Sequence, residues 1–180
     1  MIDWTNISLK DLAGYVSEEL GRRGIDTVLV GGSCVTIYSE NRYQSYDLDY
    51  VTYEDMRKVK HALAEIGFIE KAGYFQHEGC QWFVEFVSPP VAVGNESVQQ
   101  FNKVKTQLGI IKMLYPVDSV KDRLSSYYHW NDKQGLEQAI NICLEQEVDL
   151  DELKRWSFQE NHPVKFQIFI DRLKKVKKLF

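Results

Sequence analysis

The sequence predicts an α+β fold, in which a mixed β-sheet flanked by helices is followed by a C-terminal helical segment. Up to residue 115, short stretches of strand composition, such as residues 26–30, 47–51 and 81–87, alternate with helical patterns. After Tyr115-Pro116 the pattern is helical. We therefore expect an α/β core over residues 1–115 and a helical extension packed on that core over residues 116–180.

Composition and charge narrow the class of protein. A hydrophobic content of 44% in 180 residues is enough for a real core. The net charge of −4 gives no global basic field that would indicate nucleic acid, so any RNA partner would have to meet a local patch. The three cysteines, Cys34, Cys80 and Cys143, are far apart, which argues against a disulfide scaffold and a structural zinc site.

The first residues contain neither a basic start nor an apolar run, so no signal peptide is expected. No apolar run approaches the length needed to span a bilayer. We expect a soluble cytoplasmic protein without a membrane partner.

The core elements follow from capping residues and periodicity. Ser8 is a predicted N-cap for a helix that ends near Gly21 or Gly24, and a strand over residues 26–30 leads into a short helix over 33–39. Thr52 and Asp55 form an expected capping box for a helix reaching Ile66. A strand then begins at residue 68, residues 74–79 form a connector, and residues 98–113 form two short strands about Gly109.

Four helices are expected in the C-terminal segment. The first is capped by Asp118 or Ser119 and ends near Trp130, and the others start near residues 132, 148 and 163. The last one, over residues 163–177, has an apolar stripe and several lysines. A membrane-surface or RNA-binding role for it stands against the simpler interpretation of a solvated face.

An apolar run, Thr27-Val28-Leu29-Val30, ends abruptly in Gly31-Gly32-Ser33. This pattern indicates a buried strand that breaks into a tight turn before a helix. Glycine has no Cβ, so its backbone can approach a phosphate closely, and the N–H groups at a helix start favour an anion. Gly31, Gly32 and Ser33 are therefore candidate phosphate-binding residues.

The segment Asp47-Leu48-Asp49-Tyr50-Val51 is a predicted strand whose period of two places both carboxylates on one face. Two such close negative charges repel unless a cation or a proton lies between them, and magnesium suits carboxylates and substrate phosphates. The alternative is a solvated face of an edge strand. In the later strand 81–87, Glu85 is a charge among apolar residues, and we favour it as a third metal ligand over a solvent-facing edge residue.

Together and in this order, the Gly-Gly-Ser turn and the Asp-Leu-Asp strand resemble the nucleotidyltransferase superfamily of the polymerase-beta type. In that family the glycine turn holds a triphosphate, Asp-x-Asp binds two metal ions, and a later strand adds a third carboxylate. The resemblance implies a nucleotidyltransferase-like mixed sheet, an NTP substrate, and two Mg²⁺ ions held by Asp47, Asp49 and Glu85. Glu85 departs from the commoner Asp by one methylene.

Four further positions are similar to those of abortive-infection toxin nucleotidyltransferases, a toxin–antitoxin group. Arg42 and Ser45 precede the Asp pair as an Arg and a Ser or Thr do there, which makes both candidate nucleotide-binding residues, and Arg42 is interpreted equally as a phosphate contact or as a surface arginine. Lys121 and Asp132 match a later helical Lys and an Asp beyond it. The resemblance implies triphosphate contact for Lys121 and an orienting role for Asp132.

The sequence thus favours an enzyme that transfers a nucleoside monophosphate from an NTP, with ATP among the candidates, to a hydroxyl acceptor. The acceptor can be RNA such as tRNA, a protein or a small molecule. Two alternatives remain: a catalytically silent binding module, such as an antitoxin-like or regulatory partner, and a structural domain whose acidic face keeps it soluble.

Overall fold

The computed structural model describes residues 2–178, and their contacts divide them into two compact units. The first unit comprises residues up to Cys34, Ser45–Pro90 and Gln100–Leu114. The second comprises Val35–Gln44, Val91–Gln99 and the residues from Tyr115 onward. Residues 35–44 and 91–99 thus associate with the C-terminal helices. That residues 116–180 pack on a core of residues 1–115 stays a prediction.

The first unit is built on a seven-stranded mixed sheet with the order β3-β4-β5-β2-β1-β9-β8. Strand β2 runs antiparallel to β1 and parallel to β5, and β1 runs parallel to β9. The strands are β1 (Val28–Val30), β2 (Asp47–Val51), β3 (Phe68–Lys71), β4 (Tyr74–His77), β5 (Phe83–Val87), β8 (Asn102–Lys105) and β9 (Ile110–Met113).

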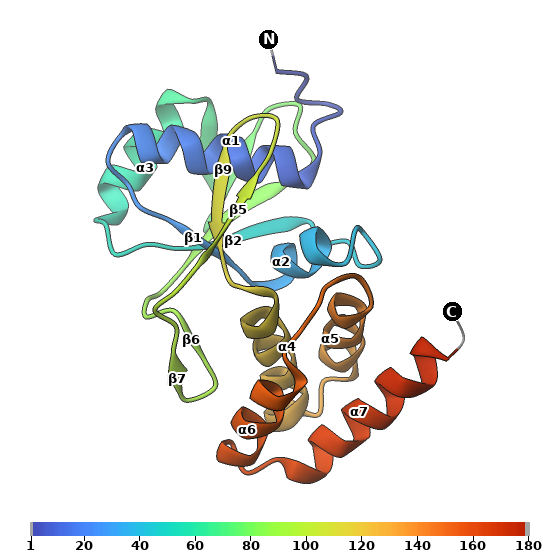
Figure 1. Cartoon of the computed structure of the whole chain (residues 1–180). Coiled ribbons are helices and arrows are strands. Elements are labelled where there is room, and N and C mark those ends of the chain that lie inside the picture. The colour runs from blue at the N-terminus through green and yellow to red at the C-terminus, as the bar shows by residue number, and fades with distance from the viewer. Residues whose placement is uncertain (1, 179–180) are drawn as a thin grey trace. The chain divides into compact units, whose positions relative to one another are not determined.

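Helices α1 (Leu9–Arg22) and α3 (Met56–Glu65) cover one side of this sheet (Figure 1). The Ser8 side chain caps α1 by accepting a hydrogen bond from the Asp11 N–H, as predicted. Leu12, Val16 and Leu20 are fully buried, because their helical spacing places them on the face that meets the sheet. This packing leaves the other side of the sheet for polar side chains.

Helix α2 (Gly31–Tyr38) begins directly after β1, two residues earlier than predicted. Residues 40–45 follow without regular structure, and both Glu40 and Asn41 have positive φ values. The expected loop before the Asp pair is therefore present.

The second unit contains the helices α4 (Pro116–Trp130), α5 (Lys133–Glu145), α6 (Leu150–Gln159) and α7 (Pro163–Lys177). It also contains a small hairpin of β6 (Ala92–Val93) and β7 (Glu96–Ser97). The buried carboxylate of Glu160 accepts hydrogen bonds from the Asn95 N–H and from Asn95 Nδ2, which fixes the turn of that hairpin. The fold class is confirmed: a mixed sheet flanked by helices is accompanied by C-terminal helices.

Three local predictions were wrong. Asp55 alone caps α3 by accepting a hydrogen bond from the Arg57 N–H, whereas the Thr52 hydroxyl accepts from the Glu54 N–H, ahead of the helix. Residues 74–77 form β4 instead of a connector, since Ala72 and Gly73 both adopt positive φ and close a tight hairpin with β3. Helix α4 starts at Pro116 rather than near Asp118, because proline is well suited to a first helical position.

Candidate active site

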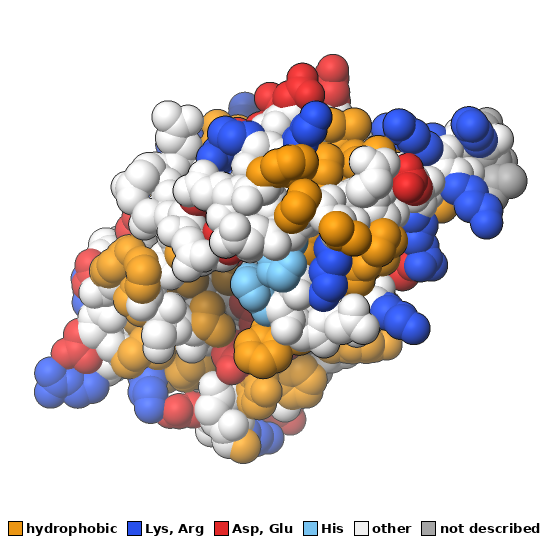
Figure 2. Space-filling model, turned by 90° about the horizontal axis from the view of Figure 1, so that it is seen from below, with side chains coloured by type: hydrophobic (Ala, Val, Ile, Leu, Met, Phe, Trp, Pro, Cys, Tyr) orange, Lys and Arg blue, Asp and Glu red, His pale blue; other side chains and the backbone are white. Residues whose placement is uncertain are grey.

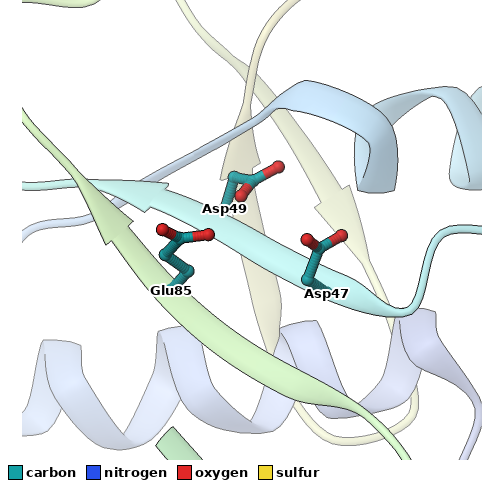
Figure 3. Close-up of side chains that lie close together, drawn as sticks. All are labelled: Asp47, Asp49 and Glu85. Carbon is teal, nitrogen blue, oxygen red and sulfur yellow. The ribbon is translucent and has the colours of Figure 1, made fainter. Parts of the chain in front are cut away.

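The structure brings the three candidate metal-binding carboxylates together on one face of the sheet. One ligand oxygen from each of Asp47, Asp49 and Glu85 lies within 4.8 Å of the others. In the parallel pair β2–β5, Asp49 lies opposite Glu85, and Asp47 points to the same face two residues earlier (Figure 3). This is the one such group among residues 2–178.

The opposite face of the same two strands fixes this orientation. Leu48, Tyr50 and Val84 are fully buried there. The Tyr50 hydroxyl donates to the Ala13 carbonyl oxygen of α1 at 2.9 Å, and the Tyr50 ring stacks on Phe86 at 5.8 Å between centroids. Burial raises the pKa of Tyr50 well above its ordinary value, so the phenol stays neutral. With these side chains anchored, a period of two turns the carboxylates outward.

Ser45 positions Asp47. The Ser45 hydroxyl donates to Asp47 Oδ1 at 2.6 Å, and Ser45 itself is buried. This hydrogen bond to a carboxylate is short and charge-assisted, so it restricts the Asp47 rotamer. The resemblance indicated Ser45 as a nucleotide-binding residue, and this contact with the acidic group was not foreseen.

Gly31 makes the close approach between the turn and the carboxylates sterically feasible. Its φ is +69°, and a Cβ added at this position would overlap the Asp49 carboxylate. The contact follows from the antiparallel pairing of β1 and β2, in which Val30 lies opposite Asp49. Sequence reasoning assigned Gly31 to phosphate binding alone, because the pairing of the two strands is not a local property.

The predicted phosphate-binding turn is the start of α2. The first N–H groups of a helix lack intrahelical acceptors and carry partial positive charge, which favours an anion beside Gly31, Gly32 and Ser33. The Ser33 side chain is fully buried and its hydroxyl donates to the Val30 carbonyl oxygen at 3.0 Å. Ser33 therefore stabilises the turn, while phosphate contact by this buried residue stays a prediction.

The remaining three candidates, Arg42, Lys121 and Asp132, belong to the second unit, where each has a partner. Arg42 forms an ion pair with Glu145. Asp132 is the N-cap of α5 and accepts a hydrogen bond from the Gln134 N–H at 2.9 Å. Their roles toward a nucleotide stay predictions.

Lys121 is buried, with only 5% of its side chain exposed, and its ammonium group is surrounded by carboxylates. Its Nζ lies 2.6 Å from Glu152 and 3.2 Å from Glu96, and Asp118 is 3.7 Å away. Burial acts to lower the pKa of Lys121, but the hydrogen bonds that its ammonium donates to Glu152 and Glu96 outweigh this effect, so the pKa is raised and the ammonium stays charged. Triphosphate contact by Lys121 stays a prediction.

The donor set of the acidic group fits a hard divalent cation. All three side chains are partly exposed, which leaves room for water or phosphate oxygens as further ligands. Carboxylate oxygens without histidine or cysteine are the ligands that magnesium prefers, and magnesium is usually held by a few carboxylates together with substrate phosphates.

No described helix is both long and apolar enough to cross a membrane.

Comparisons with known proteins bear on the fold. No protein-family model matches the sequence, and a search of curated proteins finds no match. Among solved structures, the chain is similar to an antigenic nucleotidyltransferase-like protein from Paracoccidioides brasiliensis. The TM-score is 0.59 at 15% identity, over 77% of this chain and 76% of the other.

Two structures of ANT(2″)-Ia also match. One is in complex with adenylyl-2″-tobramycin, with a TM-score of 0.48 at 11% identity over 88% of this chain and 94% of that chain. The other is a solution structure of this antibiotic-resistance factor, with the same TM-score at 13% identity over 99% and 100% of the two chains. The particular similarity to abortive-infection toxins stays a prediction. The sheet and the helices together have a nucleotidyltransferase-like fold.

Proposed function

We propose that this protein transfers a nucleoside monophosphate from a nucleoside triphosphate to a hydroxyl acceptor, using two magnesium ions. The observation that carries the proposal is the convergence of Asp47, Asp49 and Glu85 within 4.8 Å on neighbouring strands. Three carboxylates kept this close by the register of two strands repel one another unless cations lie among them. The nucleotidyltransferase-like fold supports the same interpretation.

Each chain residue has a distinct part in this proposal. Asp47, held by Ser45, and Asp49, beside the glycine turn, would hold cations next to a triphosphate, and Glu85 would complete the site toward the acceptor. The start of α2 would contribute N–H groups to the phosphates. Bound magnesium would supply charge neutralisation for the phosphates and a lowered pKa for the acceptor hydroxyl.

Positioning and electrostatic stabilisation, rather than a protein nucleophile, would account for the rate. We keep Arg42 and Lys121 as proposed phosphate contacts and Asp132 as a proposed orienting residue. Lys121 would first have to exchange Glu96 and Glu152 for a phosphate, because both carboxylates now hold its ammonium group.

The test is label transfer. The protein is incubated with each of the four α-labelled nucleoside triphosphates, magnesium and a fractionated cell extract, and the products are separated into RNA, protein and small molecules. We expect one labelled product class that requires magnesium and is absent with Asp49→Asn. Asp26→Asn is the matched control, because Asp26 is exposed and lies outside the acidic group.

Binding of a triphosphate without transfer to any fraction would favour the catalytically silent module instead. Absence of magnesium-dependent triphosphate binding would contradict the proposal altogether. Otherwise, the labelled fraction identifies the acceptor class and the label identifies the nucleotide.

A further inference from the structure

The outward face of α7 combines apolar and basic side chains in one stripe. Val164, Ile168, Arg172 and Lys175 follow one another at spacings of four, four and three residues, which places them on one side of the helix. Val164 is 73% exposed and Ile168 is 47% exposed. The inward stripe, which contains Phe166, Phe169, Ile170 and Leu173, is buried.

The second half of this helix carries a dense positive charge. Residues 172–178 include Arg172, Lys174, Lys175, Lys177 and Lys178 and no acidic residue. All five are exposed, in a chain whose net charge is −4. Figure 2, which views the molecule from below, shows Lys and Arg side chains gathered toward this end of α7, with hydrophobic side chains beside them.

The apolar and basic residues of the stripe border one hollow. Ile168, Asp171, Arg172, Lys175 and Val176 line a shallow depression on α7. Arg172 also forms an ion pair with Glu137 of α5, which holds its guanidinium on this face. A strand of polyanion lying along the helix would therefore meet charge and apolar surface at the same place.

Exposed aromatic rings lie where α7 begins. Trp130 is 82% exposed and follows His129, whose ring meets that of His162, the N-cap of α7, at 5.1 Å. Phe158 is 53% exposed and precedes the same junction, where the His162 N–H donates to the Ser157 carbonyl oxygen. Burial in the core explains neither ring, whereas stacking of unpaired bases would use both.

We propose that the α7 surface, defined as Trp130, Phe158 and the exposed side chains between Val164 and Lys178, binds single-stranded RNA. Lysines would neutralise successive phosphates, and the exposed rings and Ile168 would contact bases. RNA is assigned because it presents unpaired bases in loops and ends. A membrane fits less well, since the continuous apolar stripe of α7 is already buried against the protein.

The proposal does not depend on nucleotidyl transfer, and its test uses no nucleoside triphosphate. A fluorescein-labelled single-stranded RNA of about 20 nucleotides, longer than a typical single-strand binding site, is titrated with the full chain, and anisotropy is recorded at several salt concentrations. In the α7 variant, Lys174, Lys175, Lys177 and Lys178 are all changed to Gln. In the control variant, the same change is made at the exposed lysines Lys10, Lys71, Lys133 and Lys154.

We expect the α7 variant to lose at least about tenfold in affinity at low salt. The slope of log affinity against log salt should also become shallower, by about 0.7 for each phosphate contact removed. The control variant has the same net charge and should keep most of the affinity and the slope. Equal behaviour of the two variants would overturn the proposal, because it would show only a general charge effect.

Trp130→Ala tests the aromatic part. We expect a loss of about fivefold or more without a change in the salt slope, because stacking releases no counterions. The fold is unaffected in this variant, since the ring is almost fully exposed, and circular dichroism checks it. Unchanged affinity would contradict stacking of a base on Trp130.

Three other ligands complete the test. Duplex RNA, single-stranded DNA of the same sequence and vesicles of anionic phospholipid are titrated in parallel. We expect single-stranded RNA to bind more tightly than the duplex and at least as tightly as the DNA. Preference for the DNA or the duplex, or binding to vesicles without binding to RNA, would contradict the assignment.

Discussion

Gly31 leaves room for the Asp49 carboxylate because glycine has no Cβ. A Cβ at position 31 would overlap the Asp49 carboxylate, and the residue has a φ of +69° that L side chains rarely adopt. Gly31→Ala should therefore displace Asp49 as well as strain the backbone. We expect a loss of at least about tenfold in magnesium-dependent triphosphate affinity by calorimetry, with a stability cost of about 1–2 kcal/mol by urea unfolding.

Gly73→Ala is the matched control for Gly31→Ala. Gly73 also has a positive φ, of +91°, but nothing lies within 4 Å of an added Cβ. Its substitution should cost similar stability and leave nucleotide affinity unchanged. If both variants bound triphosphate equally well, the glycine turn would be only a structural bend.

Glu85 is expected to act on the acceptor side of the site. Glu85→Gln keeps the shape of the side chain and removes its charge next to Asp49. We expect the transfer rate to fall by about 100-fold or more, the range of lost catalytic electrostatic contacts, while triphosphate affinity changes much less. Steady-state kinetics and calorimetry measure the two quantities, and the exposed Glu78→Gln serves as control. A variant in which only affinity falls would place Glu85 on the triphosphate side.

At the scale of elements, Lys121 joins three parts of the second unit. Its ammonium group on α4 contacts Glu96 of β7 and Glu152 of α6, and α4 itself contributes Asp118. Lys121→Met would remove the buried cation of this cluster and leave Glu96 and Glu152 with Arg155 alone. We expect a loss of about 3 kcal/mol in unfolding free energy, which urea denaturation measures. Lys154→Met, at an exposed position of α6, should cost less than about 0.5 kcal/mol.

The same cluster makes stability depend on pH. Hydrogen bonds from Arg155, and then from Lys121, lower the pKa of Glu152 from 4.5 to about 2. A depressed folded pKa means that this stabilisation is complete above about pH 4.5 and is lost as pH falls toward 2. Since Glu152 is partly exposed, solvent screening limits the stabilisation from its ion pairs to an order of 1–2 kcal/mol.

Urea unfolding at pH 7, 4.5 and 3 tests this dependence against Glu152→Gln. The wild-type protein should lose more stability between pH 4.5 and 3 than the variant does. The Asp118 carboxyl makes stability depend on pH in the opposite sense, because burial raises its pKa in the folded protein and favours its protonated form. Parallel curves for the two proteins would show that the Glu152 ion pairs contribute nothing measurable.

Over the whole molecule, elements with strong local signals were predictable from sequence. The capping serine and the apolar spacing identified α1, and residues 163–177 match α7. The hairpin strand β4 was missed because its turn uses Ala72, a residue that rarely takes positive φ. The start of α4 was misplaced because the sequence favours Asp118 or Ser119 as the capping residue, whereas Pro116 occupies the first helical position.

The candidate site was predictable in its residue types and in the shared face of Asp47 and Asp49. Its assembly was not, because the pairing of Asp49 with Glu85 depends on a parallel register between strands that are distant in sequence. The contact between Ser45 and Asp47 and the carboxylates around Lys121 also arise only in three dimensions. Local chemistry thus identified the ligands, while tertiary structure brought them together.

The central claim is that Asp47, Asp49 and Glu85 hold the cations for nucleotidyl transfer. Its most direct test is a crystal structure grown with Mn²⁺ and a triphosphate analogue that cannot be cleaved between its α and β phosphates. Anomalous scattering at the manganese absorption edge then locates the metal independently of any model. We predict two anomalous peaks bridged by these carboxylates, with the triphosphate at the start of α2. A bound triphosphate without manganese among the three carboxylates would contradict the account.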